Sequence, residues 1–207
     1  MAEYRQYLRA RATSRDEEEL LAAKFAGRWP SGAPLVLAPE RDDPQLGADP
    51  ARNNAFLYAA DGDARGLKCP LGAHARRAYP RDAEITGVAR NHRIIRRSSS
   101  YGPMLPDGVL DDDGADRGIL FFCLQAQLAR QFEFIKTQWI NEGTFFGTPA
   151  EIDPLVGPHD GTGPFTIPEQ PIRRRLTELP RFVVNRGGEY CFMPGLRALR
   201  WLADLDT

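Results

Sequence analysis

The sequence predicts an α+β fold of ferredoxin-like type, in which an antiparallel sheet carries helices on one face and long irregular loops surround it. The main observation is the order of the predicted elements, which runs strand, strand, helix, strand, strand, helix. The second is the spacing between them, because residues 29–68 and 143–179 are rich in Pro and Gly and show no periodicity. A length of 207 residues is ample for a hydrophobic core.

A first helix is predicted to begin at Ser14 or Asp16 and to end near Gly27. Either residue can cap the helix, because Glu17, Glu18 and Glu19 load its first turn with negative charge. The apolar face that follows consists of Leu20, Leu21 and Phe25.

The later elements are read from their apolar patterns. HRIIRRSS at residues 92–99 alternates as a strand does, and GILFFCLQ at 118–125 is a continuous apolar run typical of a buried strand. A helix is predicted over 128–141, with one apolar face made of Leu128, Phe132, Ile135 and Trp139. RFVV and EYCFM, on either side of a turn at 185–188, predict a hairpin over 181–193. A final helix is expected over about 195–205.

Composition excludes several classes of partner. The 27 basic and 28 acidic residues give a net charge of −1, so no long-range field selects nucleic acid or an anionic membrane. The first residues contain no apolar signal region, and no apolar run approaches the length of a membrane span. The three cysteines are widely spaced, as expected for reduced thiols, so we expect a cytoplasmic protein.

The segments GLKCPLGAHARRAYPRD (66–82) and NHRIIRRSSSYG (91–102) concentrate the residues that could carry chemistry. His74 offers a neutral imidazole that could bind a metal, and Arg96 and Arg97 offer guanidinium groups that could hold an anion. Taken alone, a single histidine among small residues favours a satisfied loop histidine. A zinc site made of Cys69, His74 and His92 is possible but disfavoured, because no paired C-x-x-C accompanies it.

The sequences of these segments resemble that of the haem-binding segment of dye-decolorizing (DyP-type) peroxidases. Further resemblance lies at 118–141, at IDPLVG (152–157) and at RFVVNRGGEYCFMPGLRALRWLA (181–203). In all, residues 17–203 resemble the carboxyl-terminal half of that family. The resemblance implies a fold of the dimeric α+β barrel type and a haem b cofactor. We therefore expect an N-terminal helix and extended loop region over 1–68 and a haem-binding ferredoxin-like domain over 69–207.

The resemblance also implies roles for four residues. His74 would be the axial ligand of the haem iron, and Asp153 is the candidate that holds the second imidazole nitrogen, unless it is only a turn residue. Arg96 would lie on the distal side, where a permanent cation can bind peroxide; a strand would point Arg97 the other way, so only one of the two can face the haem. Arg81 matches the position that contacts a haem propionate.

The other two histidines and three large aromatic residues are not expected to take part in the chemistry. We expect His92 to be structural and His159 to be solvated in its loop. Trp139, Trp201 and Tyr190 could relay electrons at the surface, but their positions in helices or strands favour core packing.

The activity implied is that of a haem peroxidase that uses hydrogen peroxide to oxidise organic reductants. Members of the family carry a second, amino-terminal domain with a GxxDG motif whose aspartate acts on peroxide, and we expect this chain to contain no GxxDG motif. We therefore expect a chain that lacks the distal acid, as a truncated form or one half of a split enzyme, and that forms a homodimer or binds a partner chain with the missing half. The alternatives are a haem-binding or assembly subunit without peroxidase turnover, and a haem enzyme recruited to oxidise a specialised metabolite.

Overall fold

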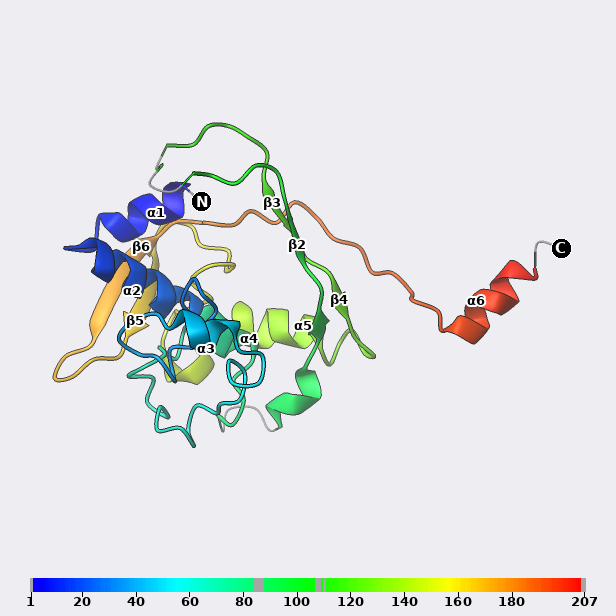
Figure 1. The fold of residues 1–207 in the computed structure, drawn as a ribbon, viewed down its shortest axis with the longest axis horizontal. Helices are drawn as coiled ribbons and strands as arrows, with labels where there is room; N and C mark the ends of the chain where they lie inside the picture. Colours follow the sequence, from blue (N-terminus) through cyan, green and yellow to red (C-terminus); the bar gives the residue numbers. More distant parts are fainter. Residues whose placement is uncertain (1, 84–87, 107–108, 110, 206–207) are drawn as a thin grey trace.

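The computed structural model describes residues 2–83, 88–106, 109 and 111–205. Within these ranges the chain forms short helices and three two-stranded antiparallel sheets, which do not close into a barrel (Figure 1). The α+β fold class with antiparallel pairing is therefore confirmed. The helical elements are α1 Ala2–Arg9, α2 Arg15–Ala26, α3 Pro44–Ala48, α4 His74–Ala78, η1 Ala89–His92, α5 Phe132–Phe134, η2 Ile135–Ile140, η3 Phe145–Gly147 and α6 Leu196–Ala203. The strands are β1 Ile95–Arg96, β2 Ser99–Tyr101, β3 Gly118–Leu120, β4 Cys123–Leu124, β5 Gly163–Ile167 and β6 Arg174–Leu179.

The first core joins the two N-terminal helices to the β5–β6 hairpin. Helix α2 starts where predicted, because the Ser14 hydroxyl accepts the Glu17 N–H at 3.2 Å, and it ends at Gly27, whose φ of 86° suits a residue without Cβ. The side chains buried between helices and hairpin are Tyr7, Leu8, Leu21, Phe25, Phe165, Ile167, Leu176 and Leu179. This core therefore packs the N-terminal helices against the β5–β6 hairpin, although the two are far apart in the sequence.

Two further cores flank helix α4. One gathers around Trp29 and Tyr58 from the long loops between α2 and α4, and the other gathers around Trp139 of η2. Trp139 is fully buried, so the core role predicted for it is confirmed. Helix α4 contacts both α2 and η2, which places its five residues at the centre of the molecule.

The predicted helix over 128–141 forms only in part. Regular helix begins at Phe132, and residues Ile135–Ile140 adopt the wider π-helical geometry, in which the Asn141 N–H donates to the carbonyl of Lys136. The wider turn still buries Ile135 and Trp139, while Leu128 lies outside the helix and is 38% exposed. The apolar face was thus correct only toward its carboxyl end.

Strands β1 to β4 form one long antiparallel ribbon. The β1–β4 and β2–β3 pairs are joined by a hydrogen bond from the Arg97 N–H to the Phe122 carbonyl at 2.8 Å. The prediction that GILFFCLQ is a buried strand is wrong for most of its length, because β3 and the two phenylalanines after it are largely exposed, while β4 is half-buried. Its large apolar side chains are 48–69% exposed at Ile95, Ile119, Leu120, Phe121 and Phe122.

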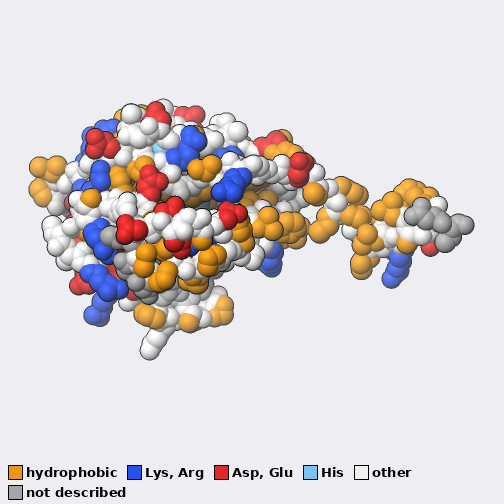
Figure 2. Space-filling model, turned by 90° about the horizontal axis from the view of Figure 1, so that it is seen from above, with side chains coloured by type: hydrophobic (Ala, Val, Ile, Leu, Met, Phe, Trp, Pro, Cys, Tyr) orange, Lys and Arg blue, Asp and Glu red, His pale blue; other side chains and the backbone are white. Residues whose placement is uncertain are grey.

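The last part of the chain, residues 180–205, is called the arm below. It runs from β6 past the ribbon and carries α6 away from the body (Figure 1). The predicted hairpin over 181–193 is wrong, since no strand forms there and the two halves do not pair. Tyr190 and Trp201 are 58% and 62% exposed, so their predicted core packing is wrong as well. Apolar side chains therefore gather along the arm in Figure 2.

The three cysteines are free and differ in exposure. Cys69 is buried, which raises the pKa of its thiol to about 12, Cys123 is half-buried, and Cys191 is exposed on the arm. No helix in the described part of the chain is both long and apolar enough to cross a bilayer.

Candidate functional site

Helix α4 begins with His74, so the imidazole stands at the start of a single helical turn. Its Nδ1 atom lies 2.8 Å from Oδ2 of Asp153, 79 residues further along the chain. The His74 side chain remains 36% exposed, whereas Asp153 is fully buried. The structure thus brings together the two residues that the sequence suggested as ligand and second-nitrogen partner.

Asp153 is held as a buried carboxylate by several donors. Oδ2 faces His74, and Oδ1 accepts the main-chain N–H groups of Leu155 at 3.0 Å and Val156 at 2.9 Å. Burial alone would raise the pKa of Asp153, but the charge and hydrogen bond of His74 and these two N–H groups lower it below its usual value. An ionised carboxylate only accepts hydrogen bonds, so Nδ1 of His74 must be the donor.

The same pair determines the state of His74. Burial lowers the pKa of His74, but the charge and hydrogen bond of Asp153 raise it by more, against opposition from Arg96 and Lys136. With its proton on Nδ1, the neutral imidazole carries its free electron pair on Nε2. Nε2 makes no hydrogen bond to any residue that the structure describes.

Arg96 lies on β1 opposite Cys123, and its side chain is exposed. Burial is the largest influence that lowers the pKa of His74, and the charge of Arg96 lowers it further, against the raising effect of Asp153. Arg97 directly follows the end of β1, and its Nη1 donates to the Arg96 carbonyl at 3.1 Å.

Arg81 is anchored away from His74. Its Nη1 donates to the carbonyls of Asn54 at 3.1 Å and Phe56 at 2.8 Å, and the guanidinium lies 3.7 Å from the centre of the Phe56 ring. Only Nη1 is used in these hydrogen bonds, so the other guanidinium nitrogens are left for an external carboxylate.

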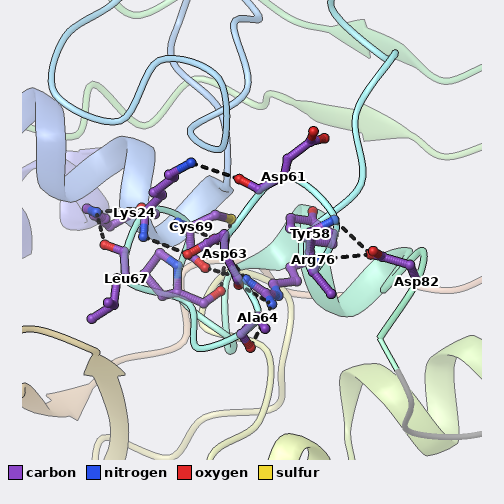
Figure 3. Close-up of polar contacts among 12 residues, drawn as sticks. Lys24, Tyr58, Asp61, Asp63, Ala64, Leu67, Cys69, Arg76 and Asp82 are labelled. Atoms are coloured by element: carbon purple, nitrogen blue, oxygen red, sulfur yellow. Dashed lines mark hydrogen bonds and ion pairs between the residues drawn. The ribbon is translucent and has the colours of Figure 1, made fainter.

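Two buried arginines of α4 were not singled out in the sequence. Arg76 forms an ion pair with Asp63 at 3.0 Å, donates to the Cys69 carbonyl and stacks over Tyr58 (Figure 3). Arg77 donates to main-chain carbonyls on the other side of the helix. A pair of adjacent arginines looks like a solvated helix face in a sequence, and nothing local reveals that both are buried.

The prediction that His159 is solvated is wrong. Its side chain is buried, with the residue 3% exposed, and Nε2 lies 2.8 Å from the Asp153 carbonyl, to which it donates. The ring fits because Gly163 has no side chain: a Cβ there would lie 2.3 Å from Nδ1 of His159. His159 therefore supports the main chain of the residue that orients His74.

The expectation that the chain lacks GxxDG needs a correction. The letters do occur, as GPHDG at residues 157–161, four residues after Asp153. Asp160 is exposed, and its carboxylate accepts the hydroxyl and N–H of Thr162 at 2.7 and 3.0 Å. The motif thus begins four residues after Asp153, the hydrogen-bond partner of His74.

The remaining histidine, His92, packs against aromatic rings. Its Nδ1 lies 2.6 Å from the Arg130 carbonyl, and its ring stacks on Phe134 with centroids 3.8 Å apart. These contacts agree with the structural role expected for His92. Among the described residues no group of three or more His, Cys, Asp or Glu could hold a metal ion, so the structure lends no support to the zinc alternative.

The donor set fits a haem iron ligated by a single histidine. Such a ligand needs a free ring nitrogen that is partly accessible and an acceptor on the other nitrogen that fixes its orientation and increases its basicity. His74 has both, through Nε2 and through Asp153. The exposed apolar side chains of the ribbon offer the kind of surface that a porphyrin face requires.

Comparison with known proteins gives a consistent result. No protein-family model matches the chain. The dye-decolorizing peroxidase of Mycena epipterygia is 36% identical over 92% of this chain and 41% of its own length, and the multifunctional dye peroxidase of Amycolatopsis sp. is 32% identical over 90% and 42%. The solved DyP-type peroxidase of Auricularia auricula-judae superposes with a TM-score of 0.75 at 30% identity, over 90% of this chain and 46% of the other.

The chain therefore spans less than half the length of the relatives it matches. Agreement in sequence and in three-dimensional structure extends over nine-tenths of its own residues. By both measures the chain is similar to somewhat less than half of a DyP-type peroxidase.

Proposed function

We propose that this chain is the haem-binding part of a DyP-type peroxidase that uses hydrogen peroxide to oxidise organic reductants, with haem b as cofactor. The observation that carries the proposal is the 2.8 Å contact between Nδ1 of His74 and buried Asp153, which leaves Nε2 as a free, accessible electron-pair donor. The identity to dye peroxidases supports the reaction class.

Bound haem would supply the redox chemistry. The residues of the chain would bind the haem, orient its ligand and stabilise charge on the peroxide. His74 would bind the iron through Nε2, while Asp153 keeps the imidazole proton on Nδ1 and holds the ring in one orientation. Arg96 would attract the peroxide anion and stabilise negative charge on its oxygens, because a guanidinium keeps its charge at every relevant pH. Arg81 would contact a propionate through the nitrogens that its main-chain contacts leave free.

The exposed ribbon and arm suggest that a partner completes the site. Exposed apolar side chains at Leu120, Phe121 and Phe122 form the kind of continuous patch that marks an interaction surface. We propose that a second copy or a partner chain covers this surface, in a cytoplasmic setting consistent with three free cysteines. Light scattering of the purified chain should give a mass above that of a monomer; a clean monomer with full peroxidase turnover would contradict this part.

The function is tested by titrating the purified chain with haemin and then adding hydrogen peroxide and a phenolic dye. We expect a Soret band typical of histidine-ligated haem, stoichiometric binding and dye oxidation that depends on both haem and peroxide. Haem binding without any dye oxidation would favour the alternative of a haem-binding or assembly subunit. Failure to bind haem at all would refute the proposal.

A further inference from the structure

Arg77 is a buried cation that forms no ion pair with a carboxylate in the part of the chain that the structure describes. It stands three residues after His74 on α4, is fully buried, and donates to main-chain carbonyls. Nε donates to Trp139 at 2.6 Å, Nη1 to Glu151 at 3.0 Å and Nη2 to Glu142 at 2.6 Å. Three charge-assisted hydrogen bonds from one planar group fix three main-chain positions at once.

Those positions belong to the segment that carries Asp153. The segment is closed by its own hydrogen bonds, from the Asp153 N–H to the Ile140 carbonyl at 2.8 Å and from the Glu151 N–H to the Gly143 carbonyl at 3.0 Å. The two acceptors, Ile140 and Gly143, directly follow Trp139 and Glu142. The carbonyls of Trp139 and Glu142 accept hydrogen bonds from Arg77. The guanidinium of Arg77 therefore binds the segment next to the main-chain hydrogen bonds that link the two ends of the segment.

We propose that Arg77 is the positioning residue for the His74–Asp153 hydrogen bond, an inference that rests on the function proposed above. His74 and Arg77 are three residues apart on the same helical turn, so holding the guanidinium in the Asp153 segment also fixes the imidazole relative to the carboxylate.

Charge supports the same role. Burial lowers the pKa of Arg77 to about 10, and the nearby carboxylate of Asp153 acts in the opposite direction, so the side chain stays charged at neutral pH. A buried anion needs a compensating cation nearby, and Arg77 supplies one without competing with His74 for the carboxylate oxygens.

Arg76 provides a matched control on the same helix. It is 1% exposed, and its hydrogen bonds go to Asp63 and to the carbonyls of Asp63, Ala64 and Cys69 (Figure 3). None of its hydrogen bonds reaches the Asp153 segment, to which it comes near only through a guanidinium 5.7 Å from the centre of the Phe146 ring. Substitution of Arg76 should therefore destabilise the fold as much as substitution of Arg77, but without releasing Asp153.

The first test uses the haem-free full chain, so its result does not depend on the proposed function. NMR would measure the exchange of the His74 Nδ1 proton with solvent in the wild type, Arg77→Gln, Arg77→Lys and Arg76→Gln. We expect Arg77→Gln to speed exchange about tenfold or more, Arg77→Lys to lie between, and Arg76→Gln to change it by less than about twofold. Equal acceleration by Arg76→Gln and Arg77→Gln, or none by either Arg77 variant, would overturn the proposal. If Arg77→Gln does not fold, the comparison of Arg77→Lys with Arg76→Gln decides.

The second test is a double-mutant cycle on haem affinity. Arg77→Gln should weaken haem binding roughly tenfold in the wild-type background and should have no further effect in Asp153→Asn, because the interaction it supports is already gone. Additive losses would show that Arg77 acts on the fold alone. If the wild-type chain does not bind haem, the proposed function is refuted. The role of Arg77 is then decided by the proton-exchange experiment alone.

Discussion

Asp153→Asn is the substitution that tests the site most directly, because it keeps the shape of the side chain and changes only its hydrogen-bonding capacity. The carboxylate accepts from three donors: His74 through one oxygen, and the N–H groups of Leu155 and Val156 through the other. If the asparagine oxygen stays with the two N–H groups, its NH₂ faces Nδ1 of His74. The imidazole proton must then move to Nε2, which removes the electron pair that would bind iron.

If the asparagine turns the other way, the His74 contact survives but the two main-chain N–H groups face an NH₂ group. Each buried donor left without an acceptor costs about 1–3 kcal/mol. Either orientation is thus penalised, and we expect haem affinity to fall about 10- to 100-fold, as is typical when the partner of a ligating histidine is changed. That range corresponds to about 1.4–2.7 kcal/mol.

The assay is a titration of the haem-free protein with haemin, followed by the Soret band. Asp160→Asn serves as the control, because it makes the same chemical change seven residues further along at an exposed carboxylate bonded only to Thr162. We expect wild-type affinity for the control. An Asp153→Asn protein that binds haem with wild-type affinity and an unchanged spectrum would show that the pair does not orient an iron ligand.

Three further predictions concern the other residues of the site. His74→Ala should lose haem and regain it partly with added imidazole, while His92→Ala should keep it; the reverse pattern in the absorption spectrum would move the ligand to His92. Arg96→Leu should bind haem normally yet react with peroxide on the order of 10²–10³ slower in stopped-flow measurements, and Arg97→Leu should not; a normal rate for Arg96→Leu would refute its role. Burial lowers the pKa of His159 in the folded state, so its contribution to stability is complete above the unfolded pKa of about 6.5 and is lost as pH falls through the lower folded value. His159→Gln should therefore flatten the loss of urea stability between about pH 7.5 and pH 5.5, and an unchanged slope would show that another group causes it.

Elements with local signals were predictable from the sequence. Helix α2 has its start encoded in the Ser14 hydroxyl and its end in Gly27, and both caps form as expected. The contact between His74 and Asp153 spans 79 residues and was suggested only by family resemblance, since no periodicity links two loops so far apart.

Features that depend on distant partners were not predictable. The apolar run at 118–125 indicates that something should cover it but not what, and within the described residues Ile119 to Phe122 remain 48–69% exposed. The position of His159 depends on the missing side chain of Gly163, which acts only once the chain has folded. The π-helical turn at 135–140 likewise reflects packing around Trp139 rather than a local residue signal.

The unequal exposure of the three thiols gives the molecule a built-in attachment point for probes. Thiol reagents attack the thiolate, so Cys69, buried and with a raised pKa, should resist them at neutral pH, and half-buried Cys123 should react slowly. Cys191 is exposed on the arm, two residues before the exposed Met193. A fluorophore or spin label placed there without any mutation would report whether the arm moves when a partner or a porphyrin binds to the ribbon.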